Sequence, residues 1–252
     1  MRFDFPSPSQ IRQLRALWQQ AFGDGEDYLD AFFSLCFSPA RSRCALRDGA
    51  VVSALYWFDF TCRGQKMAYL YAVATREDCR HQGLCRALLE DTRRILEKQG
   101  YCAALLCPEN AELARMYARF GYQPVCKIDE FTETASPRPV SLRRVFPKEY
   151  GLLRLKFLPA GSAQPEKSFL KLLARDAALY AGEDFLLAAR QQGNTLFALE
   201  LLGNREAAPG ILAALRCPQG TFRTPGRTRD FAMFLPLIPG ALPPAYFGLA
   251  LD

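Results

Sequence analysis

A short basic loop that runs into an amphipathic helix has the clearest chemistry in the sequence. Residues 78–98 read DCRHQGLCRALLEDTRRILEK, and Gly83 separates the polar residues from the leucine-spaced ones. A helix start presents unpaired backbone N–H groups and the positive end of the helix dipole, and a glycine there lets an anion reach the main chain. The pattern predicts a phosphate or diphosphate site at residues 80–85. Neither G-x-x-x-x-G-K-[ST] nor G-x-G-x-x-G is present, which disfavours a kinase or NTPase.

Two linked motifs resemble those of the GNAT superfamily of acyl-CoA-dependent N-acetyltransferases. The family signature [QR]-x-x-G-x-[GA], between a strand and a helix, is matched by Arg80-His81-Gln82-Gly83-Leu84-Cys85, with Cys85 where glycine or alanine is usual. ENAELARMYARFGYQPV, from Glu109, is similar to the second motif, a helix that opens with asparagine and ends in Phe-Gly. The resemblance covers residues 68–125 closely, and the two motifs together are more specific than either alone.

The resemblance implies that acetyl-CoA is the co-substrate and lies where the strands YLYAVAT and YCAALLC separate in a V. By this resemblance the main chain of residues 80–85 holds the pyrophosphate, and the N–H around Val73 polarises the thioester carbonyl. Asn110 is expected to bind the coenzyme or to fix the start of its helix. No metal is expected. The residues expected at the coenzyme are Val73, Thr75, Arg80, His81, Gln82, Gly83, Leu84, Cys85, Arg86 and Asn110.

The implied reaction is direct attack of a primary amine on the thioester within a ternary complex. In the family pattern a tyrosine on the later helix lies near the coenzyme sulfur, and Tyr117 holds that position as the expected general acid. The general base stays open, because Glu109 and Glu112 fit either as bases or as ordinary caps of a helix start. Tyr69 and Tyr71 either contact the substrate or pack within the sheet. Small amines and peptides both fit as acceptors.

Composition and charge raise two other functions, nucleic-acid binding and non-catalytic binding of acyl-CoA. The net charge is +6, with a pI near 8.9, which favours anionic partners. The basic stretches SLRRV and TFRTPGRTR carry no motif that reads nucleic acid, so we interpret them as solvated surface and expect no nucleic-acid partner. The alternative to an enzyme is a non-catalytic acyl-CoA-binding protein with a regulatory or interaction role.

The cysteines and the apolar runs indicate a location. Nine cysteines without a C-x-x-C pair and a single histidine, His81, argue against a zinc site or a disulfide scaffold, and most of the thiols should be buried and reduced. No apolar run approaches the ~20 residues of a membrane helix, so we expect no membrane partner. MRFDFPSPSQ lacks the layout of a signal peptide, and we expect a cytoplasmic protein.

Hydrophobic spacing predicts the elements that position the motifs in the first half. Two helices come first, in PSQIRQLRALWQQAF, with Ser9 as a possible N-cap, and in GDGEDYLDAFFSLCF. Strands over 43–62 and 66–75 follow, with a hairpin turn at Arg47-Asp48-Gly49. Then come a helix over 84–99 closed by Gly100, the strand YCAALLC, a helix stopped by Gly121, and a further strand.

The second half repeats this coarse order without the loop signature. We expect an α/β fold with a mixed α+β sheet, the GNAT fold, in two domains: a GNAT domain at residues 1–135 and a degenerate GNAT-like domain at 136–252, divided within ETASPRPVS. This arrangement is similar to tandem GNAT proteins such as the Eis-like group, in which the second half walls the substrate cleft. The predicted elements are helices in PKEYGLLRLKFL, EKSFLKLLARDAALY and REAAPGILAALRC, a hairpin turning at Gly193-Asn194, and apolar strands in FAMFLPLI and YFGLALD.

Overall fold

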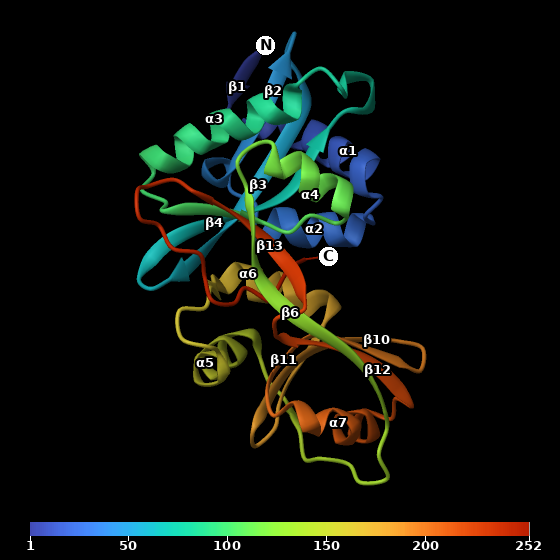
Figure 1. Ribbon diagram of the computed structural model, residues 1–252. Helices are drawn as coiled ribbons and strands as arrows, with labels where there is room; N and C mark the ends of the chain where they lie inside the picture. Colours follow the sequence, from blue (N-terminus) through green and yellow to red (C-terminus); the bar gives the residue numbers. More distant parts are fainter. Residues whose placement is uncertain (252) are drawn as a thin grey trace. The chain divides into compact units, whose positions relative to one another are not determined.

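The chain has mixed α/β structure, as predicted, and its residues form two compact units. The computed structural model describes residues 1–251. The first unit contains residues 1–106, 119–121 and 234–242, and the second contains 107–118, 122–233 and the stretch from 243 onward. In both units, helices pack on hydrogen-bonded strands (Figure 1). The two predicted domains are continuous halves of the chain that meet at 135/136, whereas each compact unit combines several separate stretches. The domain boundary therefore stays a prediction.

The first unit is built around an open sheet. The strands β1 to β4 pair antiparallel in chain order, and β5 is parallel to β4. The predicted hairpin turn is confirmed, because Asp48 and Gly49 both have positive φ, 52° and 82°. The bounds are β1 (Arg2–Asp4), β2 (Ser42–Arg47), β3 (Ala50–Cys62), β4 (Gln65–Thr75) and β5 (Ala103–Leu106).

Three predicted helices of the first unit are confirmed, and they are α1 (Ile11–Phe22), α2 (Glu26–Leu35) and α3 (Leu84–Lys98). Figure 1 shows α3 and the pair α1 and α2 on different sides of the strands. Trp18 is central to the core, with ring centroids 4.6 Å from Phe32 and 5.1 Å from Tyr56. Ser9 is not the N-cap, because it lies inside the short turn Pro8–Gln10. Instead the Gln10 side chain accepts the Ser7 N–H at 2.8 Å.

The second unit has its own run of paired strands. The β11–β12 pair is parallel, and the other pairs in this run are antiparallel. In order of pairing the strands are β6 (Gln123–Thr134), β12 (Gln219–Pro225), β11 (Thr195–Gly203), β10 (Phe185–Gln192), β9 (Ala178–Ala181) and β7 (Arg143–Arg144). The helices are α4 (Ala111–Ala118), α5 (Pro147–Phe157), α6 (Lys167–Asp176) and α7 (Ala208–Leu215), β8 covers Gln164–Pro165, and β13 (Arg229–Pro236) has residues in both units.

A fully buried ion pair organises the core of the second unit. Arg154 of α5 and Glu200 of β11 are both inaccessible to solvent, and two guanidinium nitrogens lie 2.8 Å from the two carboxylate oxygens. The Tyr150 hydroxyl donates to the same carboxylate at 2.9 Å. Arg154 also donates to the carbonyls of Ala163 and Phe247, at 2.8 and 3.0 Å. The network therefore joins a helix, a strand and the C-terminal stretch.

Three expectations for the second half are wrong. The stretch 243–251 forms no strand; it is held by hydrogen bonds such as Ala245 N–H to the Gly161 carbonyl, at 2.9 Å. TFRTPGRTR is not simply solvated surface, because it contributes to β12 and Phe222 is fully buried. The second predicted helix of the second half, EKSFLKLLARDAALY, ends at Asp176, and the residues from Ala178 form β9 against β10. The last residue of the chain lies outside the described residues.

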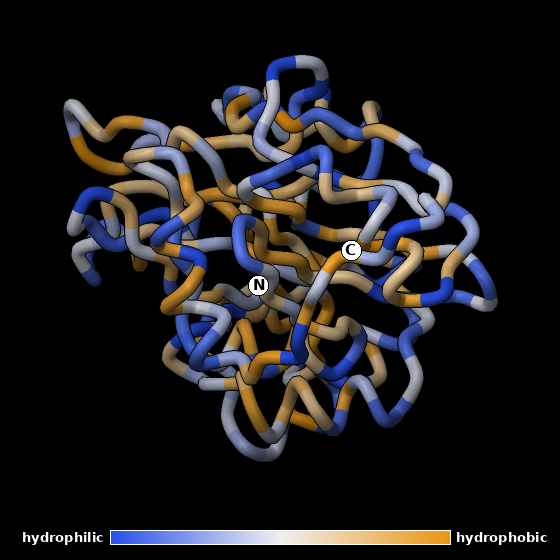
Figure 2. The backbone as a smooth tube through the Cα atoms, turned by 90° about the horizontal axis from the view of Figure 1, so that it is seen from below, coloured by the Kyte–Doolittle hydropathy of each residue, from blue (hydrophilic) through white to orange (hydrophobic). Residues whose placement is uncertain are grey.

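Hydrophobic stretches of the chain lie largely in its interior segments. Figure 2 shows them in orange, with many hydrophilic stretches, in blue, on outer loops. All nine cysteines are free, and seven of them are buried, which confirms the prediction of reduced, packed thiols. Among residues 1–251, no helix is both long and apolar enough to cross a membrane.

We expect Arg154→Met to lower the free energy of unfolding by about 3–5 kcal/mol, because it leaves the Glu200 carboxylate buried without its partner. Arg93→Ala is the matched control. It breaks an exposed pair with Glu97 at 2.8 Å and should cost less than about 1 kcal/mol. Urea unfolding of the two variants measures both effects. Equal losses would contradict a central role for the buried pair.

Candidate functional site

The strands β4 and β5 separate at the place where the coenzyme is expected. Their parallel pairing covers only Met67–Tyr69 against Ala103–Leu105. β4 then continues to Thr75, so its last six residues have no β5 partner on that side. Within the first unit, this separation exposes one edge of β4 to other hydrogen-bonding partners.

A β-bulge interrupts the pairing of β4 with β3 within the stretch that β5 does not cover. β3 pairs Tyr56 with Tyr71 and Ala54 with Ala74, so Ala72 and Val73 together oppose one residue of β3. Ala72 adopts φ 48°, in the left-handed region. That conformation costs an L-residue about 1–2 kcal/mol, so the surroundings must hold it. Bulges of this kind redirect backbone and side-chain groups next to functional sites.

The bulge and the register indicate where the Val73 N–H points. The Arg76 N–H donates to the Val52 carbonyl of β3 at 2.9 Å. Successive N–H groups of a strand point to opposite edges, so the Ala74 N–H also faces β3, whereas those of Val73 and Thr75 face the other edge. On that edge β5 has already separated. The N–H that the resemblance assigns to the thioester carbonyl is thus directed away from its neighbouring strand.

The start of α3 has the features of an anion site. Gly83, at φ 75°, is its N-cap and offers no capping side chain, and the first turn contains no acidic residue. The Ala87 N–H makes the first intrahelical bond, to the Gly83 carbonyl at 3.0 Å, so the N–H groups of residues 84–86 precede the helical ladder. Arg80, His81 and Arg86 are exposed beside them. These residues fit a diphosphate.

Side chains of the loop hold its shape. Arg80 donates through Nε to the Thr75 carbonyl at 3.3 Å, and Gln82 donates to the Asp78 carbonyl at 3.2 Å. Arg47, from the β2–β3 turn, donates to Gln82 Oε1 at 2.8 Å. Arg80, at the first position of the signature, and Gln82, at one of its unspecified positions, therefore use their side chains within the protein. The main chain is left as the principal anion ligand.

Leu84 and Cys85 anchor the first turn of α3. Leu84 is buried in a cluster with Ala45, Val52 and Cys79. Cys85 is half-buried, and this burial raises the pKa of its thiol to about 11. The thiol is therefore neutral at physiological pH. It brings no negative charge to the anion site.

The remaining predicted residues lie in the second unit. Asn110 Oδ1 accepts the Leu113 N–H at 3.0 Å, so Asn110 caps the start of α4, which is one of its two expected roles. Tyr117 is buried, with its ring edge-on to Tyr122 at 5.8 Å. Glu109 and Glu112 are exposed. The roles of Tyr117 and Glu109 toward the coenzyme, and of Asn110 as a coenzyme ligand, stay predictions.

Tyr69 and Tyr71 belong to the aromatic core of the first unit, which favours packing over substrate contact. The Tyr69 ring lies 5.7 Å from that of Phe60, and the Tyr71 ring lies 5.5 Å from that of Trp18. The hydroxyls of Tyr71 and Tyr28 are 2.7 Å apart. Burial, reinforced by the Tyr28 neighbour, raises the pKa of Tyr71 well above its usual value.

The second unit repeats the local topology of the site but closes its anion-binding end. β10 and β11 form a hairpin, α7 crosses over, and β12 pairs parallel to β11, as β3, β4, α3 and β5 do in the first unit. Before α7, however, the Asn204 side chain accepts the Glu206 N–H at 3.0 Å. Glu206 adds a negative charge, and Pro209 removes a backbone donor. An anion would meet a carboxylate and fewer free N–H groups there.

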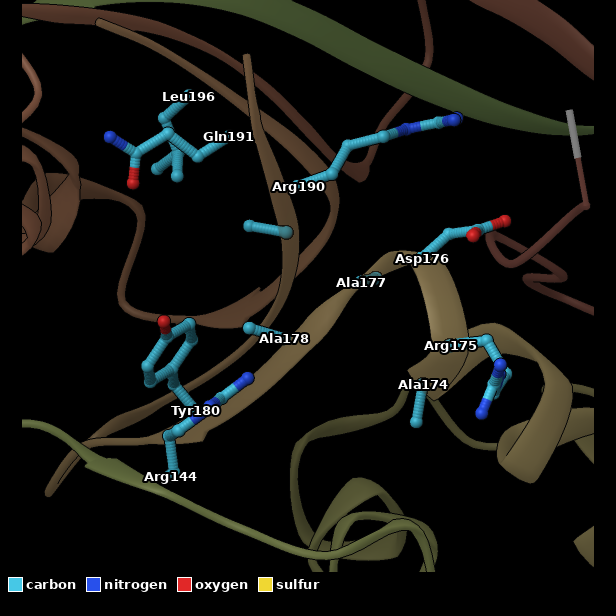
Figure 3. A pocket seen from close by; sticks show the side chains of 11 residues that line it. Arg144, Ala174, Arg175, Asp176, Ala177, Ala178, Tyr180, Arg190, Gln191 and Leu196 are labelled. Carbon is cyan, nitrogen blue, oxygen red and sulfur yellow. The ribbon is translucent and has the colours of Figure 1, made fainter. Parts of the chain in front are cut away.

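A hollow of about 210 Å³ in the second unit contains none of the predicted site residues. Arg144, Tyr180 and Gln191 lie along it, as do Arg175 and Arg190. Figure 3 shows the Arg175 and Arg190 side chains directed away from Tyr180 and Gln191, so the arginines do not converge on one point. Within the described part of the chain, no group of three or more His, Cys, Asp and Glu residues is arranged to hold a metal ion.

We expect Cys85 to react slowly with iodoacetamide at pH 8, because a pKa of about 11 leaves about a hundredfold less thiolate than an ordinary value of 9.0. Its rate should keep rising between pH 9 and 10, where the thiol of the urea-unfolded chain levels off. Mass-spectrometric mapping of the labelled peptide measures both. A folded-state rate that levels off near pH 9 would show an unperturbed thiol.

Comparisons with known proteins give a family model and a fold that the chain matches. A family model described as an acetyltransferase (GNAT) domain matches residues 3–125, whereas no curated protein matches the chain. A GCN5-related N-acetyltransferase from Kribbella flavida superposes with TM-score 0.71 at 18% identity, covering 92% of this chain and 70% of that one.

Two further solved structures resemble the chain over nearly its whole length. A GCN5-related N-acetyltransferase from Anabaena variabilis has TM-score 0.72 at 16% identity, with 94% and 73% of the two chains covered. Eis1 from Mycobacterium abscessus has TM-score 0.69 at 14% identity, with 94% of this chain and 74% of that chain covered. At these low identities, the structural likeness shows the fold alone. The family model adds a likeness in sequence over residues 3–125. The chain therefore has the GNAT fold, and its residues 3–125 match the model of the GNAT acetyltransferase domain.

Proposed function

We propose that this acyltransferase is an acetyl-CoA-dependent N-acetyltransferase that acts on a primary amine by direct attack in a ternary complex. One arrangement supports this proposal more than any other. A strand whose bulge turns the Val73 N–H away from β3 leads within a few residues to a helix start with free N–H groups and no acidic residue. An oxyanion donor and a diphosphate site thus lie at the two ends of a single loop.

Different residues of β4 and of this loop bind different groups of the coenzyme. The main chain of residues 80–85 holds the pyrophosphate, with Arg80, His81 and Arg86 adding positive charge. Val73 donates its N–H to the carbonyl oxygen, where negative charge grows as the amine attacks, so the donor stabilises the transition state more than the ground state. Acetyl-CoA, when bound, supplies an acyl group that the thioester already activates. Thr75 and Leu84 fix the ends of the loop.

Proton transfers complete the proposed reaction. The amine nitrogen forms a bond to the carbonyl carbon while the carbon–sulfur bond breaks. Tyr117 gives its hydroxyl proton to the departing thiolate sulfur, and Glu109 takes the proton that the amine loses, directly or through water. Small amines and peptide amino groups are both acceptors of the right chemistry. We also propose the division into domains at 135/136, a cytoplasmic location, and neither nucleic acid nor a membrane among the partners.

We expect Gly83→Glu to weaken acetyl-CoA binding by about a hundredfold, because like charges about 4 Å apart repel by about 1–4 kcal/mol. Gly100→Glu is the matched control. It lies at the other end of α3, has a similar φ of 77°, and likewise has open space around the added side chain. Calorimetric titration measures both affinities. Equal affinities in the two variants would place the pyrophosphate elsewhere, and absence of binding to the wild type would refute the enzyme proposal.

We expect Tyr117→Phe to lower kcat about a hundredfold with little change in acetyl-CoA affinity, because it removes the proton donor but keeps the ring. Tyr122→Phe, in the adjacent buried ring, should leave kcat unchanged. Thiol release with a panel of small amines and peptides provides the measurement. Coenzyme binding without turnover of any amine would favour the non-catalytic acyl-CoA-binding alternative. Parallel losses of kcat and affinity would reduce Tyr117 to a packing residue.

A further inference from the structure

A buried serine lies behind the bulge of β4. Ser53 of β3 is fully inaccessible to solvent and pairs with Thr75 in the register. Its hydroxyl donates to the Ala74 carbonyl at 2.7 Å, and its oxygen lies 2.9 Å from Thr75 Oγ1. Since a serine hydroxyl has one proton, the Thr75 hydroxyl must be the donor in the second contact. A directed chain therefore runs from Thr75 through Ser53 to the main chain of Ala74.

This chain of hydroxyls holds the residues on which the proposed site depends. Ala74 directly follows Val73, and Thr75 is the last residue of β4 before the loop. The Thr75 carbonyl also accepts the Arg80 side chain, at 3.3 Å. One residue before Val73, Ala72 has its unfavourable φ of 48°. Such a conformation persists only where the neighbouring structure over-determines it.

The second unit offers an internal comparison. β11 also carries one extra residue opposite β10, since Ala188 pairs with Glu200 and Ala189 with Ala198. The extra residue, Leu199, is not among those with positive φ. The pair that corresponds to Ser53 and Thr75, one step beyond the bulge, is Leu187 and Leu201. The hydroxyl chain thus lies beside the bulge of β4, which contains the strained Ala72 and precedes the proposed anion-binding loop. The bulge of β11 has no strained residue and no such loop, and leucines replace the two hydroxyl residues there.

We propose that Ser53 is a positioning residue for acyl transfer, whose hydroxyl fixes the bulge so that the Val73 N–H points at the thioester carbonyl oxygen. The inference rests on the proposed function and deepens it. Val73 is the group that touches the reacting atoms, and Ser53 acts through it. A misdirected donor lowers the stabilisation that develops in the transition state, so kcat should fall more than coenzyme affinity.

The test compares Ser53→Ala with Ser42→Ala. Ser42 is also buried and lies in the neighbouring strand β2, and its hydroxyl likewise donates to the main chain, shared between the carbonyls of Ser38 at 2.9 Å and Pro39 at 3.1 Å. We expect Ser53→Ala to lower kcat by about ten- to a hundredfold while the Kd of acetyl-CoA changes by less than about threefold. Ser42→Ala should leave both unchanged. Equal kcat in the two variants, or a proportional loss of affinity in Ser53→Ala, would overturn the proposal.

Amide hydrogen exchange provides a readout that needs no turnover. Exchange at residues 73–76 should be about tenfold faster in Ser53→Ala than in the wild type or in Ser42→Ala. Unchanged exchange would overturn the proposal whatever the activity. If the wild type acetylates no amine, the proposed function fails, whereas the exchange experiment still decides whether Ser53 holds the bulge.

A second pair of variants covers the case in which Ser53→Ala does not fold. Thr75→Val removes the donor to Ser53 and keeps the branched shape, whereas Thr75→Ser keeps the hydroxyl. We expect lower kcat and faster exchange at residues 73–76 for the valine variant than for the serine variant. The same kcat and exchange in both would contradict the hydroxyl chain.

Discussion

Backbone N–H groups that have no strand or helix partner are the constraint on which the first unit depends. Such groups must find another acceptor, in water or in a ligand. The pairing of β4 with β5 ends at Tyr69, and α3 begins at a glycine with no acid in its first turn. In the proposed function, the donors at these two places bind one molecule, which carries both a carbonyl and a diphosphate. Aromatic packing around Trp18, the Arg47–Gln82 bond and the Ser53 hydroxyl hold the two places in shape.

The two halves show how little chemistry separates an anion site from a closed helix start. Both contain a hairpin, a bulge, a crossover helix and a parallel strand. In the second, Asn204 satisfies a free N–H, Glu206 repels an anion and Pro209 lacks a donor. In the first, α3 begins at Gly83 with no acidic residue in its first turn, and Arg80, His81 and Arg86 are exposed. Electrostatics at one turn, and not the topology, therefore distinguishes the two units.

The second unit is held by a different kind of interaction. Arg154 and Glu200 are buried without access to water, so each depends on the other and on surrounding hydrogen bonds. Tyr150 donates to the Glu200 carboxylate, and Arg154 also donates to Ala163, Gln164 and Phe247. The C-terminal stretch needs no strand pairing, because this network and bonds to the loop at Gly161 hold it. In the second unit a buried polar network holds neighbouring elements together, whereas in the first unit aromatic packing around Trp18 does so.

Local patterns in the sequence were sufficient for the helices α1, α2 and α3, the β2–β3 and β10–β11 hairpins and the loop at residues 80–85. Their periodicity, turn residues and motif spacing act over a few residues. Long-range partners decided the rest. Residues 246–251 form no strand because Arg154 and the loop at 161–163 bond their backbone, and β12 was missed because its polar residues alternate with a buried Phe222. Nothing local marks Ser53 or Arg47, whose partners lie 22 and 35 residues away. Hydrogen bonds between segments so far apart exist only once the sheet has formed, so tertiary structure alone reveals them.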